Sequence, residues 1–313
     1  MFNIRLKGIR GFIKEVFEKF IDDKCPKLGA ALSFYTIFSI APVIVIAIAV
    51  AALIFGKDAA RGEIISQIQG LAGYEGAKVI QTALKNAQYS GKGFITIITG
   101  FVALVIGSTV VFVELQDSLN IIWKVKPRPE RNLFKGLLKD RIQSFAMVIA
   151  TGFLLLLSLA VTTFLSSINN YISVTFFDIP KFVLDGSDII ISLSMTFLLF
   201  MMIFKVLPDV QIRWKHVWVG ALVTSVFFVL GKYLIGLYLG TSSLGSTYGA
   251  AGSLVIFLLW VYYSAQILFI GAEFTQVYAN KYGEGIKPAS KFMKYEEAGI
   301  IKKEKEENKE ESG

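Results

Sequence analysis

The sequence predicts an all-α, polytopic membrane protein with six transmembrane helices, an amphipathic N-terminal helix and a helical external loop. Two observations indicate this class. Of 313 residues, 54% are hydrophobic and only 18% are charged, and the apolar residues form long runs separated by basic segments. The mean hydropathy is +0.59, and average soluble domains carry roughly 25% charged residues. This composition argues against a soluble enzyme, a disulfide-built secreted module and a disordered chain.

Six apolar runs are long enough to cross a hydrocarbon core of about 30 Å at about 1.5 Å per helical residue. They cover residues 29–54, 93–116, 143–165, 186–207, 217–239 and 250–279. Helices are required because unpaired backbone groups cannot face lipid. We therefore expect a cytoplasmic amphipathic segment (1–28), a six-helix transmembrane domain (29–280) with an external helical loop (57–92), and a charged, disordered cytoplasmic tail (281–313).

The distribution of basic residues predicts the orientation. Most of the 32 Lys and Arg residues lie in the N-terminal segment, the second and fourth connections and the C-terminal tail. The connections on the opposite side carry far fewer. Because Lys and Arg are retained on the cytoplasmic side, and an even number of spans puts both termini on one side, we expect both termini in the cytoplasm of a multi-pass plasma-membrane protein.

Charge and composition also exclude several kinds of site. The net charge of +8 would favour nucleic-acid binding in a soluble protein, but here topology explains the basic residues, so we expect no nucleic-acid partner. Cys25 is the single cysteine and forms no internal disulfide. His216 is the single histidine, which excludes His/Cys metal clusters and His-based triads. We expect no cofactor, no metal and no catalytic residue.

Two segments outside the spans have helical patterns. Residues 4–21 predict an amphipathic helix with an apolar stripe of Ile9, Phe12, Ile13, Val16, Phe17 and Phe20. The cations on its other face suit the anionic inner leaflet, and the alternative is that the stripe packs on the protein's own spans. The connection 57–92 contains two helical patterns, around Ile64 and Val79. We expect it to form an external cap.

Small and polar side chains interrupt the first span. The candidates for a transport path are Ser33, Tyr35, Thr36 and Pro42. Pro42 lacks an amide donor, frees the carbonyl of Phe38 and should kink the helix, and a kinked helix lined with hydroxyl groups can border a polar path. The alternative is tight helix packing, with Gly29 and Ser33 on a small face and the hydroxyls bonded to their own helix.

The last two spans add further candidates for this path. Lys232 in the fifth span either snorkels, pairs with a carboxylate, or lines an aqueous cavity. Tyr262, Gln266 and Glu273 fall within about 40° of one another around the sixth span at 100° per residue. A stripe of phenol, amide and carboxylate inside lipid should face the bundle interior. Glu273 lies near the inner end, where an ion pair is the alternative.

The second span ends in a candidate carboxylate pair. Glu114 and Asp117 are three residues apart, so their carboxyls can approach and either share a proton or hold a cation. Gln116 and Asn120 follow at a spacing of four. These groups lie near the cytoplasmic interface beside Lys124, where salt bridging is an equally good explanation.

Three motifs resemble signatures of a known family. They are Leu28-Gly-Ala-Ala-Leu-Ser-Phe-Tyr-Thr-Ile-Phe-Ser-Ile-Ala-Pro42, Leu119-Asn-Ile-Ile-Trp-Lys-Val125, and Tyr248-Gly-Ala-Ala-Gly-Ser-Leu254, which continues through Trp260, Gln266 and Gly271-Ala-Glu273-Phe. With matching spacing over residues 10–280, the chain resembles the YihY/virulence factor BrkB family. The resemblance implies a bacterial inner-membrane protein with six spans and cytoplasmic termini. It carries no agreed catalytic assignment.

Members of that family have also been labelled ribonuclease BN, and the sequence argues against this activity. Hydrolysis of a phosphodiester usually needs metal-binding carboxylates or histidines in a site open to water. One histidine and no paired-acid metal motif do not supply such a site.

We expect a transporter or translocator of a solute or of a lipid-like, amphiphilic molecule, not an enzyme. Its partners would be membrane lipids and an unknown small-molecule or lipid substrate, and a homo-oligomer is compatible with the sequence. No Gly-x-x-x-x-Gly-Lys-Ser/Thr motif occurs, so energy would come from a gradient or a partner. The alternative is a non-transporting envelope protein with a structural or interaction role. An intramembrane enzyme would need a nucleophile and a matching base, and we find no such pair.

Overall fold

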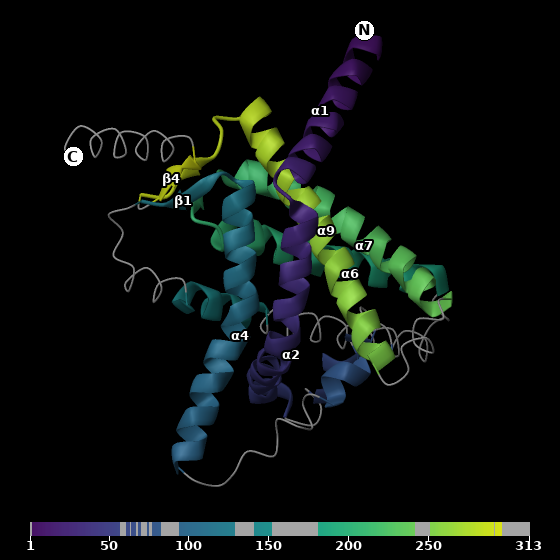
Figure 1. The fold of residues 1–313 in the computed structure, drawn as a ribbon. Coiled ribbons are helices and arrows are strands. Elements are labelled where there is room, and N and C mark those ends of the chain that lie inside the picture. Colours follow the sequence, from purple (N-terminus) through teal and green to yellow (C-terminus); the bar gives the residue numbers. More distant parts are fainter. Residues whose placement is uncertain are drawn as a thin grey trace, which may run out of the picture.

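The computed structural model describes most of the chain. Its described residues are 2–56, 61–62, 64–66, 68–69, 74, 77–82, 94–128, 141–151, 181–241, 251–290 and 292–295. Six long helices form the body of this described part (Figure 1). They are α1 (Phe2–Asp22), α2 (Cys25–Phe55), α4 (Phe94–Ile122), α6 (Lys181–Val206), α7 (Trp214–Thr241) and α9 (Gly252–Tyr282). The predicted all-α fold class is confirmed.

Four of these helices contain stretches that are long and apolar enough to cross a membrane. The stretches are Cys25–Ile48, Val105–Ile122, Trp214–Ile235 and Gly252–Tyr282. They correspond to the first, second, fifth and sixth predicted spans. A shorter apolar stretch, Ser192–Val206, lies within the fourth. The third, at 143–165, is helical through residue 151, and its remainder lies outside the described residues. A polytopic membrane protein is confirmed, and the number of six spans stays a prediction.

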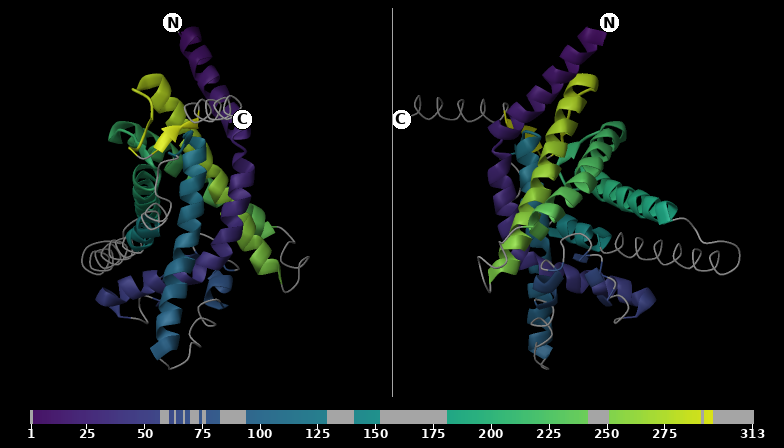
Figure 2. Two further views of the ribbon diagram at one scale, coloured as in Figure 1. Left: turned by 60° about the vertical axis from the view of Figure 1, so that its left-hand side comes forward. Right: turned by 90° about the vertical axis from the view of Figure 1, so that its right-hand side faces the viewer.

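Helix α9 is the central element of the bundle. It packs against α1, α2, α4 and α7, whereas α6 packs against α7, and α2 against α4 (Figure 2). The largest apolar core joins these helices toward the basic end of the molecule, with side chains such as Leu119, Phe204 and Phe269 completely buried. Most of the groups that matter for function therefore contact α9 or a helix packed on it.

Helices α7 and α9 approach closely because each supplies a glycine for a threonine of the other. A side-chain carbon added to Gly220 would overlap Thr275, and one added to Gly271 would overlap Thr224. Each threonine hydroxyl donates to the carbonyl of the glycine four residues earlier in its own helix, at 2.7 Å in both cases. We call these two contacts, Gly220 with Thr275 and Gly271 with Thr224, the glycine–threonine exchange. Both threonine hydroxyls in it are hydrogen-bonded, and the two helix backbones approach closely, as in the packing that drives helix association in lipid.

The apolar stripe of α1 is divided between two environments. Phe12 and Val16 are buried against Val277 and Phe274 of α9, and Phe20 is buried in the main core. Three neighbouring apolar side chains, Ile13, Phe17 and Ile21, are 50%, 54% and 63% exposed. Packing on the protein's own spans therefore accounts for one row of the stripe and leaves the adjacent row uncovered.

The connection predicted at 57–92 is helical where it is described. Its Ile64 and Ile80 are buried in one apolar cluster with Ile44 of α2 and with Phe257 and Val261 of α9. The connection thus covers the ends of two spans rather than extending away from them.

The C-terminal segment corrects one expectation. Residues 281–313 were expected to be disordered, but the chain forms β3 (Lys287–Pro288) and β4 (Phe292–Lys294). Strand β4 pairs with β1 (Val125–Pro127), and β3 pairs with β2 (Val210–Gln211), both antiparallel. Ile286, Phe292 and Met293 are buried. Burial of these apolar side chains stabilises the segment, although its overall composition is rich in Lys and Glu. Residues 296–313 lie outside the described residues.

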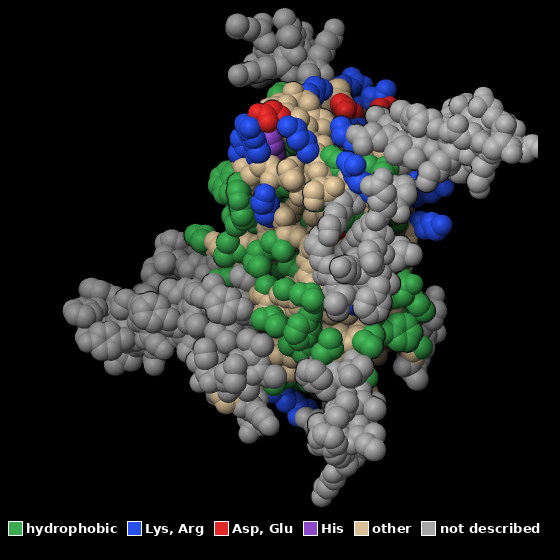
Figure 3. Space-filling view, turned by 90° about the vertical axis from the view of Figure 1, so that its left-hand side faces the viewer, with side chains coloured by type: hydrophobic (Ala, Val, Ile, Leu, Met, Phe, Trp, Pro, Cys, Tyr) green, Lys and Arg blue, Asp and Glu red, His purple; other side chains and the backbone are tan. Residues whose placement is uncertain are grey.

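Charged side chains gather at one end of the molecule. Figure 3 shows Lys and Arg around the single histidine at the end that also holds the start of α1 and the β1–β4 pair, with hydrophobic side chains along the body beneath. A smaller basic group lies at the opposite end. The described parts of these basic segments are also in contact, because β1 pairs with β4, β2 pairs with β3, and Lys281 lies 3.8 Å from Glu15.

The glycine–threonine exchange predicts a large difference between two Gly→Ala substitutions. Gly220→Ala should lower stability by about 1–3 kcal/mol because the new methyl group overlaps Thr275. The matched control is Gly11→Ala in α1, where nothing lies within 4 Å of the added carbon. That change should stabilise by about 0.5–1 kcal/mol because alanine favours the helix. Thermal unfolding of the two variants in detergent measures the difference, and equal unfolding temperatures would contradict the exchange.

Candidate functional site

Two sharp turns at the basic end of the molecule build the candidate site. Helix α1 ends in an elbow before α2, and α4 ends just before β1. The turning residues Lys24 and Lys124 have φ angles of 55° and 59°, a left-handed conformation that non-glycine residues seldom adopt. Their amides bond to the carbonyls of Ile21 and Ile121, at 3.0 and 3.1 Å. The turns bring residues just past each helix end next to α9.

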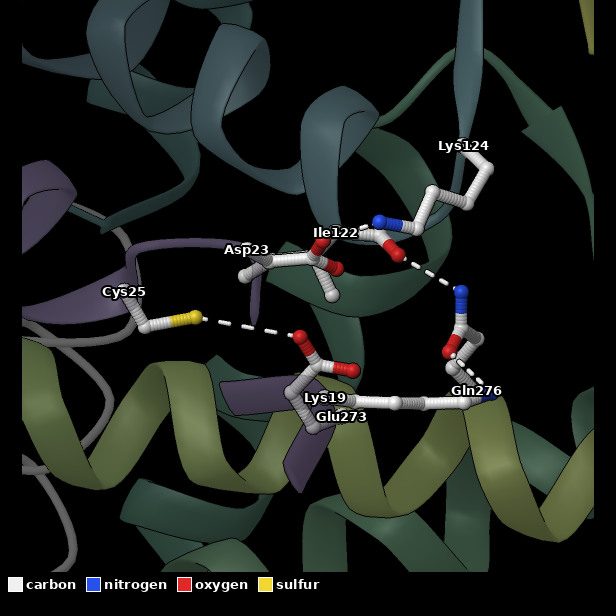
Figure 4. A network of polar contacts seen from close by, with 7 residues as sticks. All are labelled: Lys19, Asp23, Cys25, Ile122, Lys124, Glu273 and Gln276. Carbon is white, nitrogen blue, oxygen red and sulfur yellow. Dashed lines mark hydrogen bonds and ion pairs between the residues drawn. The ribbon is translucent and has the colours of Figure 1, made fainter. Parts of the chain in front are cut away.

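A network of polar side chains joins these turns to α9, and Figure 4 shows it as sticks. We call it the Glu273 cluster. Its side chains are those of Lys19, Asp23, Cys25, Lys124, Glu273 and Gln276. Lys124 forms an ion pair with Asp23. Lys19 Nζ donates to Gln276 Oε1 at 3.0 Å, and Gln276 Nε2 donates to the carbonyl of Ile122 at 2.6 Å. Three segments far apart in sequence, residues 19–25, 122–124 and 273–276, thus meet at α9.

Glu273 is the most isolated charge-bearing group of this cluster. Its side chain is 0% exposed and begins about 14 Å from the C-terminal end of α9, at about 1.5 Å per residue. The thiol of Cys25 donates to Glu273 Oε1 across 3.8 Å. Glu273 Oε2 has no hydrogen-bond donor among the described residues, and the same holds for Asp23 Oδ2. The Asp23 and Glu273 carboxyl groups lie near each other in Figure 4, and Asp23 acts electrostatically on Glu273.

A second buried network, the Asp209 cluster, lies between α4 and the α6–α7 connection. It consists of Gln116, Asn120 and Asp209. Gln116 Nε2 and Asn120 Nδ2 donate to Asp209 Oδ2 at 2.7 and 3.2 Å, and the Asp209 amide donates to Asn120 Oδ1 at 2.9 Å. The amide of Ala289 donates to the Asp209 carbonyl at 3.0 Å. The Asp209 cluster therefore holds α4, the α6–α7 connection and the C-terminal segment together.

Polar groups continue from the Glu273 cluster along the contact between α2 and α9. The amide of Gln266 lies against Gly29, because a side-chain carbon added there would overlap Gln266 Nε2. Both polar atoms of this amide are buried without a hydrogen-bond partner in the described part of the chain. Gln266 and Glu273 are two turns apart on α9, and both contact α2. We call this contact the α2–α9 seam.

Tyr295 closes the basic end beside the Glu273 cluster. Its amide donates to the carbonyl of Lys124 at 3.0 Å, and its ring lies 5.5 Å from Lys126 Nζ. Burial raises the pKa of the Tyr295 phenol, and the charge of Lys124 opposes this rise.

The predicted polar residues of the first span are mostly satisfied within α2. Ser33 donates to the Gly29 carbonyl and Thr36 to the Leu32 carbonyl, each at 2.7 Å. Tyr35 is 37% exposed. Pro42 lies inside the helix, against Gly107 of α4, where an added carbon would be 3.0 Å from the Pro42 ring. These contacts match the packing alternative for the two hydroxyls.

The other predicted residues are spread over several places. Tyr262 is half-buried on α9. Lys232 lies about 27 Å along α7 from Trp214 at 1.5 Å per residue, with its Nζ 5.2 Å from the ring centre of Tyr233. Glu114 is half-buried, whereas Asp117 is exposed and acts electrostatically on Tyr295. The structure thus brings Gln266 and Glu273 to the seam, and it places Lys232 and the Glu114–Asp117 pair elsewhere.

Sequence reasoning missed several members of the two clusters. Asp23, Lys19 and Gln276 fall on helices or turns that meet only in three dimensions, and Asp209 lies in a short connection. One signal was available: Asp23 is an acidic residue that lies five residues before the long uncharged run that starts at Leu28. Among the described residues, no group of three or more His, Cys, Asp or Glu side chains is arranged to hold a metal ion. The arrangement suits hydrogen bonding and proton exchange.

The comparison with known proteins assigns the family. The model of the family described as virulence factor BrkB matches residues 16–296. The chain belongs to this family. Similar relatives named UPF0761 membrane protein occur in Verminephrobacter eiseniae, at 29% identity over 82% of this chain and 60% of the relative, and in Azotobacter vinelandii, at 26% over 84% and 62%. A third, in Pseudomonas aeruginosa, is 26% identical over 83% and 61%.

The chain spans about three fifths of the length of the curated relatives it matches. No solved structure matches it. Family membership establishes an integral membrane protein, and the printed names of these relatives state no activity.

The Asp209 cluster predicts a graded response to substitution. Asp209→Leu leaves the amides of Gln116 and Asn120 without their acceptor and should cost about 1–3 kcal/mol of stability. Asp209→Asn keeps one side-chain oxygen in the same place and should cost less. Thermal unfolding in detergent distinguishes the two. If both variants unfolded at the native temperature, these buried hydrogen bonds would not stabilise the inner end.

Proposed function

We propose that this protein is a transporter or translocator of a solute or a lipid-like, amphiphilic molecule, rather than an enzyme. We place it in the bacterial plasma (inner) membrane, with both termini in the cytoplasm. The observation that carries the proposal is the α2–α9 seam, where Gln266 and Glu273 keep buried polar atoms without hydrogen-bond partners in the described residues. The gathering of basic residues at the end holding α1 and β4 supports the orientation.

The energetic cost of these groups supports a function for the seam. A buried polar atom without a partner costs about 1–3 kcal/mol, and three such atoms lie on two side chains of one helix face. Apolar side chains of similar size would pack against α2 without this cost. Polar side chains inside a membrane usually mark the pathway of a substrate, ion or proton. The amide of Gln266 offers a donor and an acceptor, and Glu273 offers a carboxyl group.

The packing of the two helices supports a seam that changes its separation. Gly29 leaves room for the Gln266 side chain on one side of the seam. Pro42 removes one backbone hydrogen bond from α2 and marks a point where that helix can bend. A small change at this bend alters the distance between α2 and α9 along the seam, and we propose that this change opens the path.

The competing proposal is a non-transporting envelope protein with a structural or interaction role. It is supported by the connection 57–92, which packs over the ends of α2 and α9, and by the uncovered apolar row of α1. Loss of a cellular phenotype on deletion of 57–92, combined with silent Glu273→Gln and Lys232→Met substitutions, would favour this role over transport.

Flux through reconstituted vesicles tests the transport proposal. We expect native protein to accelerate either the flipping of a fluorescent phospholipid or the decay of a pH gradient reported by a trapped dye. Gln266→Leu should reduce that rate at least tenfold, because it removes both polar atoms from the seam. The matched control, Ser264→Ala, removes a hydroxyl that bonds within α9 to the Trp260 carbonyl at 2.9 Å and should leave the rate unchanged. Rates equal to those of empty vesicles in both assays would argue against transport.

We also propose that membrane lipids cover the exposed row of α1. Ile13, Phe17 and Ile21 are uncovered, and the exposed cations Arg10 and Lys14 lie on the same helix, as in helices that bind anionic leaflets. In vesicles containing phosphatidylglycerol, a spin label at Phe17→Cys should be accessible to oxygen and shielded from a water-soluble relaxing agent. A label at the adjacent Glu18→Cys should show the reverse. Equal exposure of both labels to the water-soluble agent would exclude lipid contact.

A further inference from the structure

In the Glu273 cluster, two buried carboxyl oxygens lack a hydrogen-bond donor among the described residues. Asp23 Oδ1 is paired with Lys124, and Glu273 Oε1 accepts the thiol hydrogen of Cys25. The remaining oxygens, Asp23 Oδ2 and Glu273 Oε2, are buried and receive no donor from the described residues. The two carboxyl groups nevertheless lie near each other in Figure 4, and Asp23 acts electrostatically on Glu273. Two ionised carboxylates offer only acceptors, so a hydrogen bond between them requires a proton on one.

The surrounding charges indicate which carboxyl holds that proton. The charged groups that act on Glu273 are Asp23, Lys124 and Lys19. The ammonium of Lys124 is engaged by Asp23, and that of Lys19 by Gln276 Oε1 at 3.0 Å and Glu15 at 3.8 Å. Among the described residues, no ion pair includes Glu273. A completely buried carboxylate without an ion pair is costly and avoids that cost by binding a proton.

We propose that Asp23 and Glu273 form a one-proton site, in which the neutral Glu273 carboxyl donates its hydrogen to Asp23 Oδ2. Asp23 stays ionised and is balanced by Lys124, so the pair carries one negative charge against one positive charge. The carboxyl pair alone would not carry this inference. The second observation is that the Glu273 side chain is 0% exposed and keeps an oxygen without a donor in the described residues, while its carboxyl group lies near that of Asp23 in Figure 4.

Protons from water can reach this site through the ion pair of Asp23 and Lys124. The side chain of Lys124 is 47% exposed, whereas that of Asp23 is 4% exposed, so the ion pair lies between water and Glu273. A proton from water enters at Asp23 when the ion pair opens, passes to Glu273 Oε2, and leaves by the same steps in reverse. Gln266 lies two turns farther along the seam. This part rests on the proposed function, because it makes the proton the coupling ion for movement through the α2–α9 seam.

A metal ion is the alternative occupant, and the geometry disfavours it. The described part of the chain provides no cluster of three or more His, Cys, Asp or Glu groups able to ligate one. The Cys25 thiol contacts Glu273 rather than a position between the two carboxyls. A proton on Glu273 needs no further ligand, whereas a metal ion would need ligands beyond the two carboxyl groups.

Infrared spectroscopy of the full chain in lipid nanodiscs tests the site without any transport measurement. We expect a carbonyl band of a buried carboxylic acid at neutral pH, shifted to lower frequency in heavy water. Glu273→Gln should abolish that band, and it should fold because a glutamine amide can donate to Asp23 as the acid does. Asp23→Asn should keep a band whose pH titration is displaced, because the neighbouring charge is gone. The control Glu114→Gln, in a half-buried carboxyl on α4, should leave the band in place.

Three results would overturn the proposal: no acid band in the native chain, an unchanged band in Glu273→Gln, or an unchanged titration in Asp23→Asn. If Glu273→Gln did not fold, the band of the native chain labelled with ¹³C at glutamate should shift, and an unshifted band would have the same consequence. The site and the transport proposal fail separately. An acid band without any vesicle flux leaves a proton site in a non-transporting protein, whereas flux without the band removes the proton site alone.

Discussion

The close approach of α9 to its neighbours is the constraint on which the described structure depends. In lipid, apolar side chains gain little by leaving the solvent, so helices associate through tight packing and hydrogen bonds. Gly220 and Gly271 let α7 and α9 touch through threonine side chains, and Gly29 does the same for α2 at Gln266. Because α7 and α2 both press on α9 in this way, the polar side chains of α9 are held in contact with protein. Glu273 and Gln266 are buried for that reason, despite their affinity for water.

At the basic end of the molecule, the polar side chains that this packing buries need hydrogen-bond partners within the protein. Two networks of different character contain these side chains. The Asp209 cluster pairs a carboxylate with two amide donors and the adjacent backbone. Such an arrangement stabilises because each donor has an acceptor. The Glu273 cluster also ties three segments together, but in the described residues it leaves one oxygen of each of its two carboxyl groups without a donor. The Asp23 and Glu273 carboxyl groups are therefore held in place, while the unpaired oxygens leave their protonation and hydrogen bonding free to change.

Composition and periodicity were sufficient for much of this fold, because membrane spans are long and leave strong patterns. The helix positions over 29–54, 217–239 and 250–279 followed from apolar runs, and the common face of Gln266 and Glu273 followed from the 100° helical step. The partner of that face did not follow, because Asp23 and Gly29 reach α9 only through the tertiary arrangement. The order at 286–295 was missed since the pairing of β3 and β4 depends on strands far earlier in the chain. The glycine–threonine exchange corresponds to a pattern in the sequence. Gly-Ala-Leu-Val-Thr224 and Gly-Ala-Glu-Phe-Thr275 have the same spacing of small residues.

The pairing of β1 with β4 and of β2 with β3 has a consequence for biogenesis. A ribosome delivers the first two spans to the membrane long before it has made α9 and the strands that follow. Until then Asp23 has no Glu273 beside it, the indole of Trp123 lacks the Ala272 carbonyl to which it later donates at 3.1 Å, and the two inner connections have no strands to pair with. These contacts therefore form only after α9, β3 and β4 have been synthesised. Chains released early from translation would leave the polar groups of Asp23 and Trp123 and the two connections without these partners.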